Sequence, residues 1–261
     1  MVTWFAQLQQ ELKTEKLPAF YSFSFVPQID STNRVVKQWG KEGAFEGRVL
    51  IACSQTAGRG RLGRSFFSPD SGIYLSVLLR PDLSPKETLR LTTAAAVAVA
   101  QALGESAQIK WVNDVFLKGK KVCGVLTESA LTGKNLDYAV VGIGLNLWQP
   151  TQGFPQDLQQ IAGPIFDTKP TEKQVAELVG KILTRFYECY QNIFDPAILE
   201  VYQKRNLLQG KTVTAGKVCG RVVGIAPDFS LQLQEKNGKI HTVQAGEATI
   251  GSATFKENEL C

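Results

Sequence analysis

A thirteen-residue segment, Ala52–Arg64 (ACSQTAGRGRLGR), has the residue types and spacing of a ligand-binding loop. It contains three glycines and three arginines, and no Asp or Glu lies between Glu46 and Asp70. Glycine lets a backbone approach a ligand closely, and the planar guanidinium group of arginine suits carboxylates and phosphates. Because no nearby residue in the sequence compensates these arginines, the segment predicts a flexible loop that binds an anion.

Three interpretations of this loop compete. Gly58–Gly63 matches the G-x-G-x-x-G pattern of dinucleotide-binding folds, but it lacks the helix that should follow directly and the acidic residue expected about 20 residues later. A nucleic-acid-binding patch would suit the formal net charge of +5, although aromatic residues are not interleaved with the basic ones as in a stacking platform. The third interpretation is a solvated surface loop.

The full pattern is more specific than its parts. A-x-x-Q-x-x-G-R-G-R-x-G-R resembles the signature of biotin protein ligases, and the residues that fit it are Ala52, Gln55, Gly58, Arg59, Gly60, Arg61, Gly63 and Arg64. Ser31-Thr32-Asn33 alone would be an ordinary helix N-cap, but it resembles the family's S-T-N triplet, which supplies hydroxyl and amide groups to biotin. Lys110–Asp114 (KWVND) resembles K-W-P-N-D, with Val112 in place of the proline.

Two further segments extend the resemblance over nearly the whole chain, in the family's order. Lys120–Gly124 is similar to a K-x-x-G segment whose lysine, here Lys121, contacts the carboxylate of biotin and the α-phosphate. Gly142–Asn146 (GIGLN) is similar to a strand end whose asparagine reads the adenine.

The resemblance implies a role for each matching residue, while the metal ligands stay unknown. The expected catalytic residues are Lys121, Arg64 and Asp114. The expected biotin contacts are Ser31, Thr32, Asn33, Gln55, Arg59, Gly60, Arg61 and Lys121. The expected contacts to ATP or the adenylate are Arg59, Arg61, Arg64, Phe66, Asn113 and Asn146.

The implied reaction has two steps, with ATP and Mg²⁺ as cofactors. ATP first converts the carboxylate of biotin into biotinyl-5′-AMP, and a lysine of a biotin carboxyl carrier protein, from acetyl-CoA carboxylase or a related carboxylase, then attacks the mixed anhydride. At an ordinary pKa of about 10.4, only about one such lysine in 2,500 is neutral at pH 7. Asp114 is the candidate for accepting the lysine's proton, and its alternative role is that of a strand-end cap.

Hydrophobic patterning predicts an α+β fold. Strands are expected over 23–29, 49–54, 72–79, 109–112, 121–128 and 138–145, and helices over 3–12 and after Ser31, Ser84 and Thr171. Hairpins mixed with helices favour a mixed or largely antiparallel sheet. The resemblance implies the catalytic fold related to class II aminoacyl-tRNA synthetases over residues 1–208. Short, glycine-rich strands after Gln209 predict a small SH3-like β-barrel over 209–261, with a hairpin turn at Asn237-Gly238.

Composition limits the alternatives. The 261 residues include five scattered cysteines without a C-x-x-C pair and one histidine, His241, which is expected to be structural. Reduced thiols, together with the lack of a signal peptide or a membrane-spanning apolar run, predict a cytoplasmic protein with no membrane partner. Thirty residues before Ser31 are too few for the family's DNA-binding module, which predicts a ligase without a repressor role or a specific DNA partner. The expected state is a monomer or homodimer.

A related enzyme that transfers lipoate or octanoate is the principal alternative. Such enzymes share the expected fold but lack the arginine–glycine signature of Ala52–Arg64.

Overall fold

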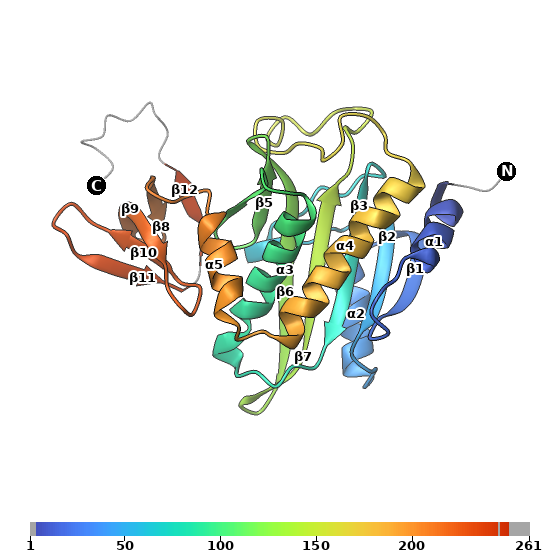
Figure 1. Ribbon diagram of the computed structural model, residues 1–261, viewed down its shortest axis with the longest axis horizontal. Helices are drawn as coiled ribbons and strands as arrows, with labels where there is room; N and C mark the ends of the chain where they lie inside the picture. The colour runs from blue at the N-terminus through green and yellow to red at the C-terminus, as the bar shows by residue number, and fades with distance from the viewer. Residues whose placement is uncertain (1–3, 245, 251–261) are drawn as a thin grey trace.

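Two β-sheets organise the chain in a computed structural model that describes residues 4–244 and 246–250 (Figure 1). The first sheet has seven strands in the order β1-β2-β3-β7-β6-β5-β4. Their bounds are β1 Ser22–Ile29, β2 Arg48–Gln55, β3 Gly72–Leu79, β4 Gln108–Lys110, β5 Asp114–Leu117, β6 Lys120–Thr132 and β7 Asn135–Asn146. Only β1 and β2 run parallel to each other, and the remaining neighbours are antiparallel, which confirms the predicted mixed sheet.

Five α-helices accompany the sheets within the described residues, and predicted capping groups stand at the starts of α2 and α4, while Thr3, the predicted cap of the first helix, lies outside the described residues. Their bounds are α1 Trp4–Thr14, α2 Thr32–Lys41, α3 Leu89–Ala102, α4 Glu172–Gln191 and α5 Pro196–Lys204. The Ser31 hydroxyl accepts a hydrogen bond from the backbone amide of Arg34 and so caps α2. Thr171 and Gln174 form a capping box at the start of α4. The capping box at Ser84 starts a short 3₁₀ turn, Pro85–Glu87, which leads into α3.

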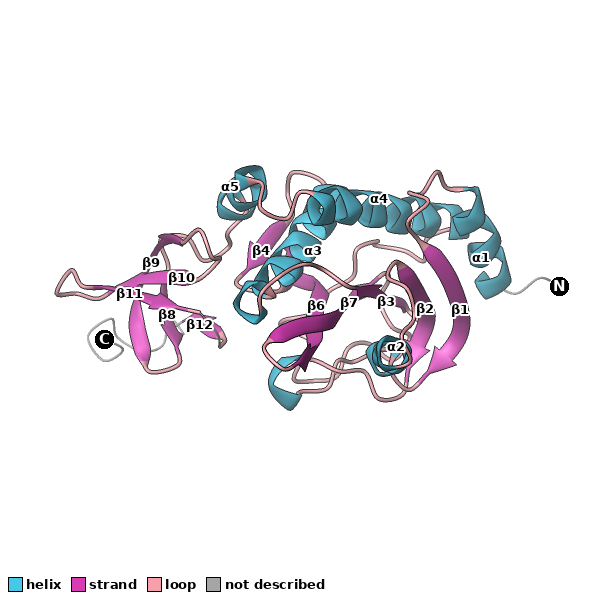
Figure 2. Cartoon of the chain, turned by 90° about the horizontal axis from the view of Figure 1, so that it is seen from below, coloured by secondary structure: helices cyan, strands magenta, loops and turns pink. Residues whose placement is uncertain are grey.

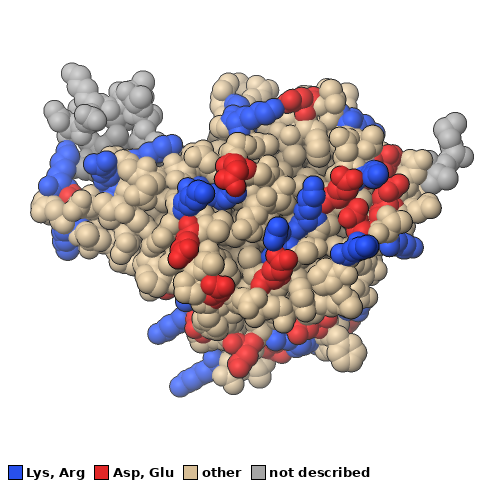
Figure 3. Space-filling model, in the orientation of Figure 1, with Lys and Arg blue, Asp and Glu red and all other residues tan. Residues whose placement is uncertain are grey.

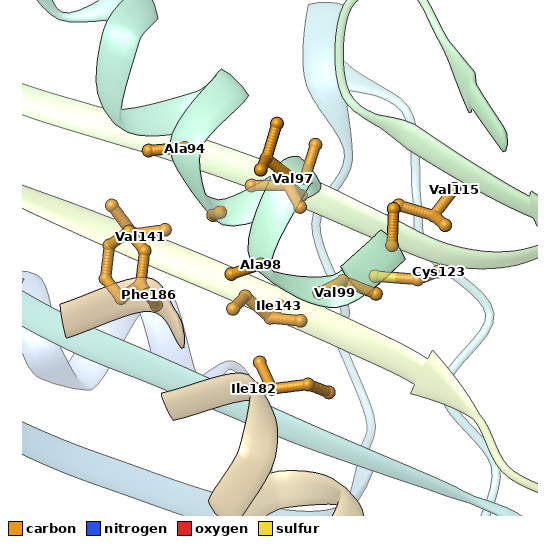
Figure 4. Packing of buried hydrophobic residues seen from close by; sticks show 14 of the residues in the cluster. Ala94, Val97, Ala98, Val99, Val115, Cys123, Val141, Ile143, Ile182 and Phe186 are labelled. Atoms are coloured by element: carbon orange, nitrogen blue, oxygen red, sulfur yellow. The ribbon is translucent and has the colours of Figure 1, made fainter. Parts of the chain in front are cut away.

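The seven-stranded sheet is covered on both faces. Helices α3 and α4 lie on one face and α2 lies on the other (Figure 2). On the α3/α4 face, small side chains of α3 pack against Val141 and Ile143 of β7 and against Ile182 and Phe186 of α4 (Figure 4). Ala94 and Ala98 are fully buried there, so α3 lies close to the sheet and makes a dense core.

The α2 face is different, because part of it is built from residues without large side chains. Side chains alternate between the faces of a strand, so Gly142 and Gly144 of β7 both belong to this face. The register pairs Gly144 with Tyr74 of β3 and with Gly124 of β6. It likewise pairs Gly142 with Ser76 of β3 and with Leu126 of β6. At the glycines of these two adjacent rows, no side chain separates the backbone of the sheet from the residues that pack on the α2 side.

The second sheet is antiparallel and has five strands in the order β11-β10-β9-β8-β12. Their bounds are β8 Thr212–Ala215, β9 Val218–Ile225, β10 Leu231–Gln234, β11 Ile240–Val243 and β12 Ala248–Ile250. A hydrogen bond joins this domain to the first one: the indole N–H of Trp111 donates to the carbonyl of Phe229, in the turn before β10, at 2.9 Å. The Phe229 ring also contacts the Tyr202 ring of α5. The α+β class with a small C-terminal β domain is thus confirmed, and the boundary between 208 and 209 stays a prediction.

Several elements depart from the sequence-based expectation. Strand β5 and helix α5 have no counterpart in the predicted set, and β6 extends four residues beyond 128, to Thr132. Strand β5 is too short to show a periodic pattern, and it is defined by its pairing with β4 and β6. Helix α5 packs on α3 and β9, so tertiary contacts stabilise a helix of only nine residues.

The remaining expectations concern thiols, charge and membrane spans. Cys53, Cys123 and Cys189 carry free, buried thiols. Lys and Arg side chains are interspersed with Asp and Glu on the face that carries α3 and α4 (Figure 3). Over residues 4–244 and 246–250, each helix is too short or too polar to cross a membrane.

Candidate functional site

A cleft on the α2 side of the large sheet brings the predicted site residues together. It encloses about 920 Å³ of empty space, including its open mouth. Its lining includes the predicted residues Ser31, Thr32, Asn33, Gln55, Arg59, Gly60, Arg61, Arg64, Phe66, Asn113, Asp114 and Lys121. These residues come from α2, the Arg59–Phe66 loop and the strands β2, β5 and β6. Asn146 is the predicted residue that does not line the cleft.

The glycine rows of the sheet form the floor of this cleft. The Phe66 ring lies directly on them, since a Cβ added at Gly144 would be 2.6 Å from Phe66 Cε1 and one added at Gly124 would be 2.8 Å from Phe66 Cε2. A Cβ added at Gly142 would overlap the side-chain oxygen of Asn33. Any larger residue at these positions would therefore displace Phe66 or Asn33.

One end of the cleft is a cluster of uncharged polar groups. Gln55 Oε1 accepts hydrogen bonds from the amide of Thr32 at 2.9 Å and from its hydroxyl at 3.1 Å. Gln55 Nε2 donates to Ser68 Oγ at 3.1 Å. Ser31, Thr32 and Asn33 are all buried at the first turn of α2. This end offers donors and acceptors without net charge, which suits a neutral polar ligand.

The arginine segment is a short hairpin. Phe66 N donates to the carbonyl of Gly58 at 2.9 Å, and Gly60 N donates to that of Arg64 at 2.8 Å. A single 3₁₀ turn at the tip, Arg61–Gly63, contains Leu62 in the left-handed region with φ 56°. Leu62 is 73% exposed, so the tip has backbone strain and little apolar packing to offset it.

Acidic residues distant in sequence compensate two of the arginines, which corrects the expectation of an uncompensated loop. Glu128 Oε1 of β6 lies 3.1 Å from Arg59 Nη1. Glu247, just before β12, accepts a hydrogen bond from Arg64 Nη1 at 2.9 Å. Arg61 instead donates to the side-chain oxygen of Asn113 at 3.2 Å. The hairpin is thereby joined both to the large sheet and to the C-terminal β domain.

The pKa values of these groups follow from their surroundings. Burial lowers the pKa of the Arg61 guanidinium, and the nearby carboxylates of Asp114 and Glu247 act in the opposite direction. The hydrogen bond from Arg64 lowers the pKa of Glu247. At neutral pH, both members of the Arg64–Glu247 pair are therefore charged.

Lys121 and Asp114 form the second charged centre of the cleft. Lys121 Nζ lies 2.7 Å from Asp114 Oδ1, and both side chains are about three-quarters buried. Lys121 Nζ also lies 5.7 Å from the centre of the Phe66 ring. The peptide bond between Trp111 and Val112 is cis, and the chain continues from it to Asn113 and Asp114 at the edge of the cleft. A cation and a carboxylate thus face the same space above the glycine floor.

Asn146 lies at the end of β7, where its amide donates to the carbonyls of Lys121 and Gly163 at 3.3 Å each. Its side chain therefore supports the backbone that carries Lys121. The predicted role in reading adenine stays a prediction.

Sequence reasoning did not select Ser76, Glu128, Lys110 or Glu247 as site residues. Glu128 of β6 and Ser76 of β3 contact predicted residues of α2 and the hairpin, and Lys110 and Glu247 line the cleft. The signal for Ser76 was a hydroxyl within an otherwise apolar strand, whereas Glu128 stands in a strand of mixed polarity. The side chains that either residue contacts cannot be identified without the register of the sheet.

The sequence is similar to known proteins over most of its length. A model of the biotin/lipoate A/B protein ligase family matches residues 25–146. The bifunctional ligase/repressor BirA of Bacillus subtilis is 31% identical over 259 residues, which span 94% of this chain and 78% of BirA. The biotin–[acetyl-CoA-carboxylase] ligase of Mycobacterium tuberculosis is 31% identical over 85% of this chain and 86% of its own length.

The fold gives the same result. A biotin protein ligase from Aquifex aeolicus, solved in complex with biotin and ATP, superposes with a TM-score of 0.71 at 27% identity. The superposition covers 89% of this chain and 99% of the Aquifex chain. Sequence identity over most of both chains and a shared fold show that this protein belongs to the biotin protein ligase family.

Proposed function

We propose that this protein is an ATP-dependent biotin protein ligase that forms biotinyl-5′-AMP and transfers biotin to a lysine of a biotin carboxyl carrier protein. The observation that supports this most is the division of one cleft into two chemical ends. Uncharged donors and acceptors around Thr32 and Gln55 suit the neutral ureido ring of biotin. The cations Arg61, Arg64 and Lys121 suit the carboxylate and phosphates that react.

The first step brings two anions together, the carboxylate of biotin and the α-phosphate of ATP. Lys121 serves both, because its ammonium group faces the cleft beside the Phe66 ring. Arg61 and Arg64 stabilise the charge that develops on the phosphate and on the departing pyrophosphate. Their position supports this role, because the hairpin that carries both arginines lines the cleft.

The second step needs a neutral lysine on the carrier. Asp114 is the candidate proton acceptor, and its ion pair with Lys121 keeps the carboxylate inside the cleft. When Lys121 is engaged by the adenylate, Asp114 becomes available to the incoming amine. The two steps therefore use the same ion pair in succession.

Mg²⁺ would accompany the nucleotide. Magnesium usually binds one or two carboxylates together with substrate phosphates. The oxygen donors that line the cleft include Asn113, Asp114 and Glu247, which fits such an ion. When bound, it would supply further neutralisation of the phosphate charges.

The alternatives differ in what the polar end would accept. Lipoate and octanoate present only hydrocarbon or disulfide at that end, which would leave the buried hydroxyl and amide groups around Thr32 without a ligand partner. A ligase without a repressor role stays part of the proposal, and binding to a defined DNA operator in a footprinting assay would contradict it. We further propose that the reaction occurs in the cytoplasm, which the free thiols of Cys53, Cys123 and Cys189 support.

The proposed function predicts exchange of pyrophosphate into ATP that depends on biotin. Lys121→Ala should slow this exchange roughly 10- to 150-fold while leaving the protein folded, because one charge-assisted contact contributes roughly 1.5–3 kcal/mol at the reacting centre. Lys118→Ala removes an exposed lysine nearby that pairs with Asp167, and it should exchange normally. Exchange stimulated by lipoate or octanoate instead of biotin would contradict the assignment.

Asp114→Asn should separate the two steps. Asparagine keeps the size of the side chain but cannot accept the proton of the attacking lysine. We expect biotinyl-5′-AMP to form while transfer to a carrier protein becomes slower, measured by single-turnover transfer from preformed adenylate. An equal loss in both steps would show that Asp114 supports the nucleotide or the structure instead.

The arginine hairpin should be protected from trypsin by its ligands. Arg64 is the most accessible of its arginines, with 66% of the side chain exposed, and the apolar packing of the tip is slight. We expect cleavage after Arg64 in the free protein and strong protection when biotin and Mg-ATP are both present, measured by mass spectrometry of the fragments. Equal cleavage rates with and without both substrates would refute closure of the hairpin over the adenylate.

A further inference from the structure

One cation of the cleft forms no direct pair with an anion. Lys110, the last residue of β4, lines the cleft and is partly buried. Across the part of the chain that the structure describes, its side chain makes neither a hydrogen bond nor an ion pair. Arg59, Arg64 and Lys121, in contrast, each lie beside a carboxylate. Lys110 therefore brings a positive charge into the cleft that no neighbouring side chain neutralises directly.

The register of the sheet explains how Lys110 reaches the cleft. Gly124 of β6 pairs with Asp114 of β5, and Asp114 in turn pairs with Lys110 of β4. Residues paired directly across antiparallel strands place their side chains on the same face, with Cβ atoms about 5 Å apart. Lys110 thus extends the row of the glycine floor, and it lies one strand beyond the ion pair of Asp114 with Lys121.

The C-terminal β domain borders the same end of the cleft. Glu247 accepts a hydrogen bond from Arg64 Nη1 at 2.9 Å, and both residues line the cleft together with Lys110. The hydrogen bond from Arg64 lowers the pKa of the Glu247 carboxyl, and the positive charges of Lys110 and Lys121 act in the same direction. Three cations therefore surround one carboxylate, so this end of the cleft attracts a further anion.

Adenylation of biotin would release such an anion. A carboxylate oxygen of biotin forms a bond to the α-phosphorus of ATP, and the bond from that phosphorus to the oxygen bridging to the β-phosphate breaks. The electron pair of the broken bond stays with the pyrophosphate, so negative charge grows on the leaving group. A cation held at the position of the leaving group lowers the barrier, because it binds this charge more strongly as the charge develops.

The strand order places the groups of the cleft in the sequence that this reaction needs. The polar end lies over β3 and β7, where Ser76 and Asn33 meet beside Gly142. Lys121 belongs to β6, and Lys110 belongs to β4 at the edge of the sheet. An in-line displacement puts the leaving oxygen opposite the attacking one. With biotin at the polar end and the α-phosphate at Lys121, the pyrophosphate points toward Lys110.

We infer that Lys110 is a further catalytic residue, which binds the departing pyrophosphate and stabilises the negative charge that develops on it. This inference rests on the proposed function and deepens it, because it assigns the β4 end of the cleft to the leaving group. Lys110 acts in the first step only, since the pyrophosphate is absent when the carrier lysine attacks the adenylate.

The test measures the two steps separately in Lys110→Met, which keeps a long side chain and removes its charge. Biotin-dependent exchange of pyrophosphate into ATP should slow roughly 10-fold or more, with a higher KM for pyrophosphate, because a charge-assisted contact to the leaving group is lost. Transfer of biotin from supplied biotinyl-5′-AMP to a carrier protein should keep its wild-type rate. A merely structural role of Lys110 would lower both rates together.

Gln108→Met is the matched control, because Gln108 lies on the same strand and the same face as Lys110 but outside the lining of the cleft. It should exchange pyrophosphate and transfer biotin as the wild-type protein does. Lys110→Arg keeps the positive charge and should recover most of the exchange rate that Lys110→Met loses.

Wild-type exchange kinetics in Lys110→Met, including the KM for pyrophosphate, would overturn the inference alone. An equal loss of exchange and of transfer in Lys110→Met would also overturn it, because that result would assign Lys110 a structural role. Exchange that does not depend on biotin in the wild-type protein would overturn the proposed function and this inference with it.

Discussion

The site depends on a steric constraint, the absence of Cβ atoms at positions where other side chains touch the sheet. Gly124 and Gly144 are paired on neighbouring strands and leave room for the Phe66 ring, while Gly142 leaves room for the Asn33 amide. Because the opposite face of the same strands packs densely on α3 and α4, the sheet cannot retreat to accommodate a larger residue. The depth of the cleft is therefore fixed by glycine backbone on one face and by alanine and valine packing on the other.

Charge above this floor is arranged in pairs that a ligand can replace. Arg59, Arg64 and Lys121 each lie beside a carboxylate, and Arg61 lies beside a side-chain amide. Each pair keeps a cation oriented toward the cleft without leaving its charge unbalanced. Partly exposed pairs such as Arg64–Glu247 contribute little stability of their own, so exchanging a protein carboxylate for a substrate phosphate costs little.

Much of this architecture could be predicted from the sequence, and the parts that could not share a physical reason. Helices such as α4 carry local capping signals and periodic apolar residues, and the arginine–glycine segment carries its chemistry in consecutive positions. The acidic residues that pair with the arginines carry no such local signal, since Glu247 lies 183 positions from Arg64 and is brought to it by the C-terminal β domain. Ser76 and Glu128 likewise owe their contacts to the register of their strands. A one-residue shift in register would turn their side chains to the opposite face of the sheet. The loop that the sequence predicts to be uncompensated is compensated only in three dimensions.

The most direct test of the glycine floor is biotin-dependent exchange of pyrophosphate into ATP by Gly144→Ala. One added methyl group forces Phe66 away from the sheet, and a displacement of about 1 Å at a reacting centre can lower a rate on the order of 100-fold. Val141→Ala, on the same strand but facing α3 and α4, should lose roughly 1–3 kcal/mol of stability and keep its exchange activity. We predict a large loss of exchange in Gly144→Ala with an unfolding midpoint close to that of the wild-type protein. Exchange at the wild-type rate in Gly144→Ala would contradict the central role of the glycine floor.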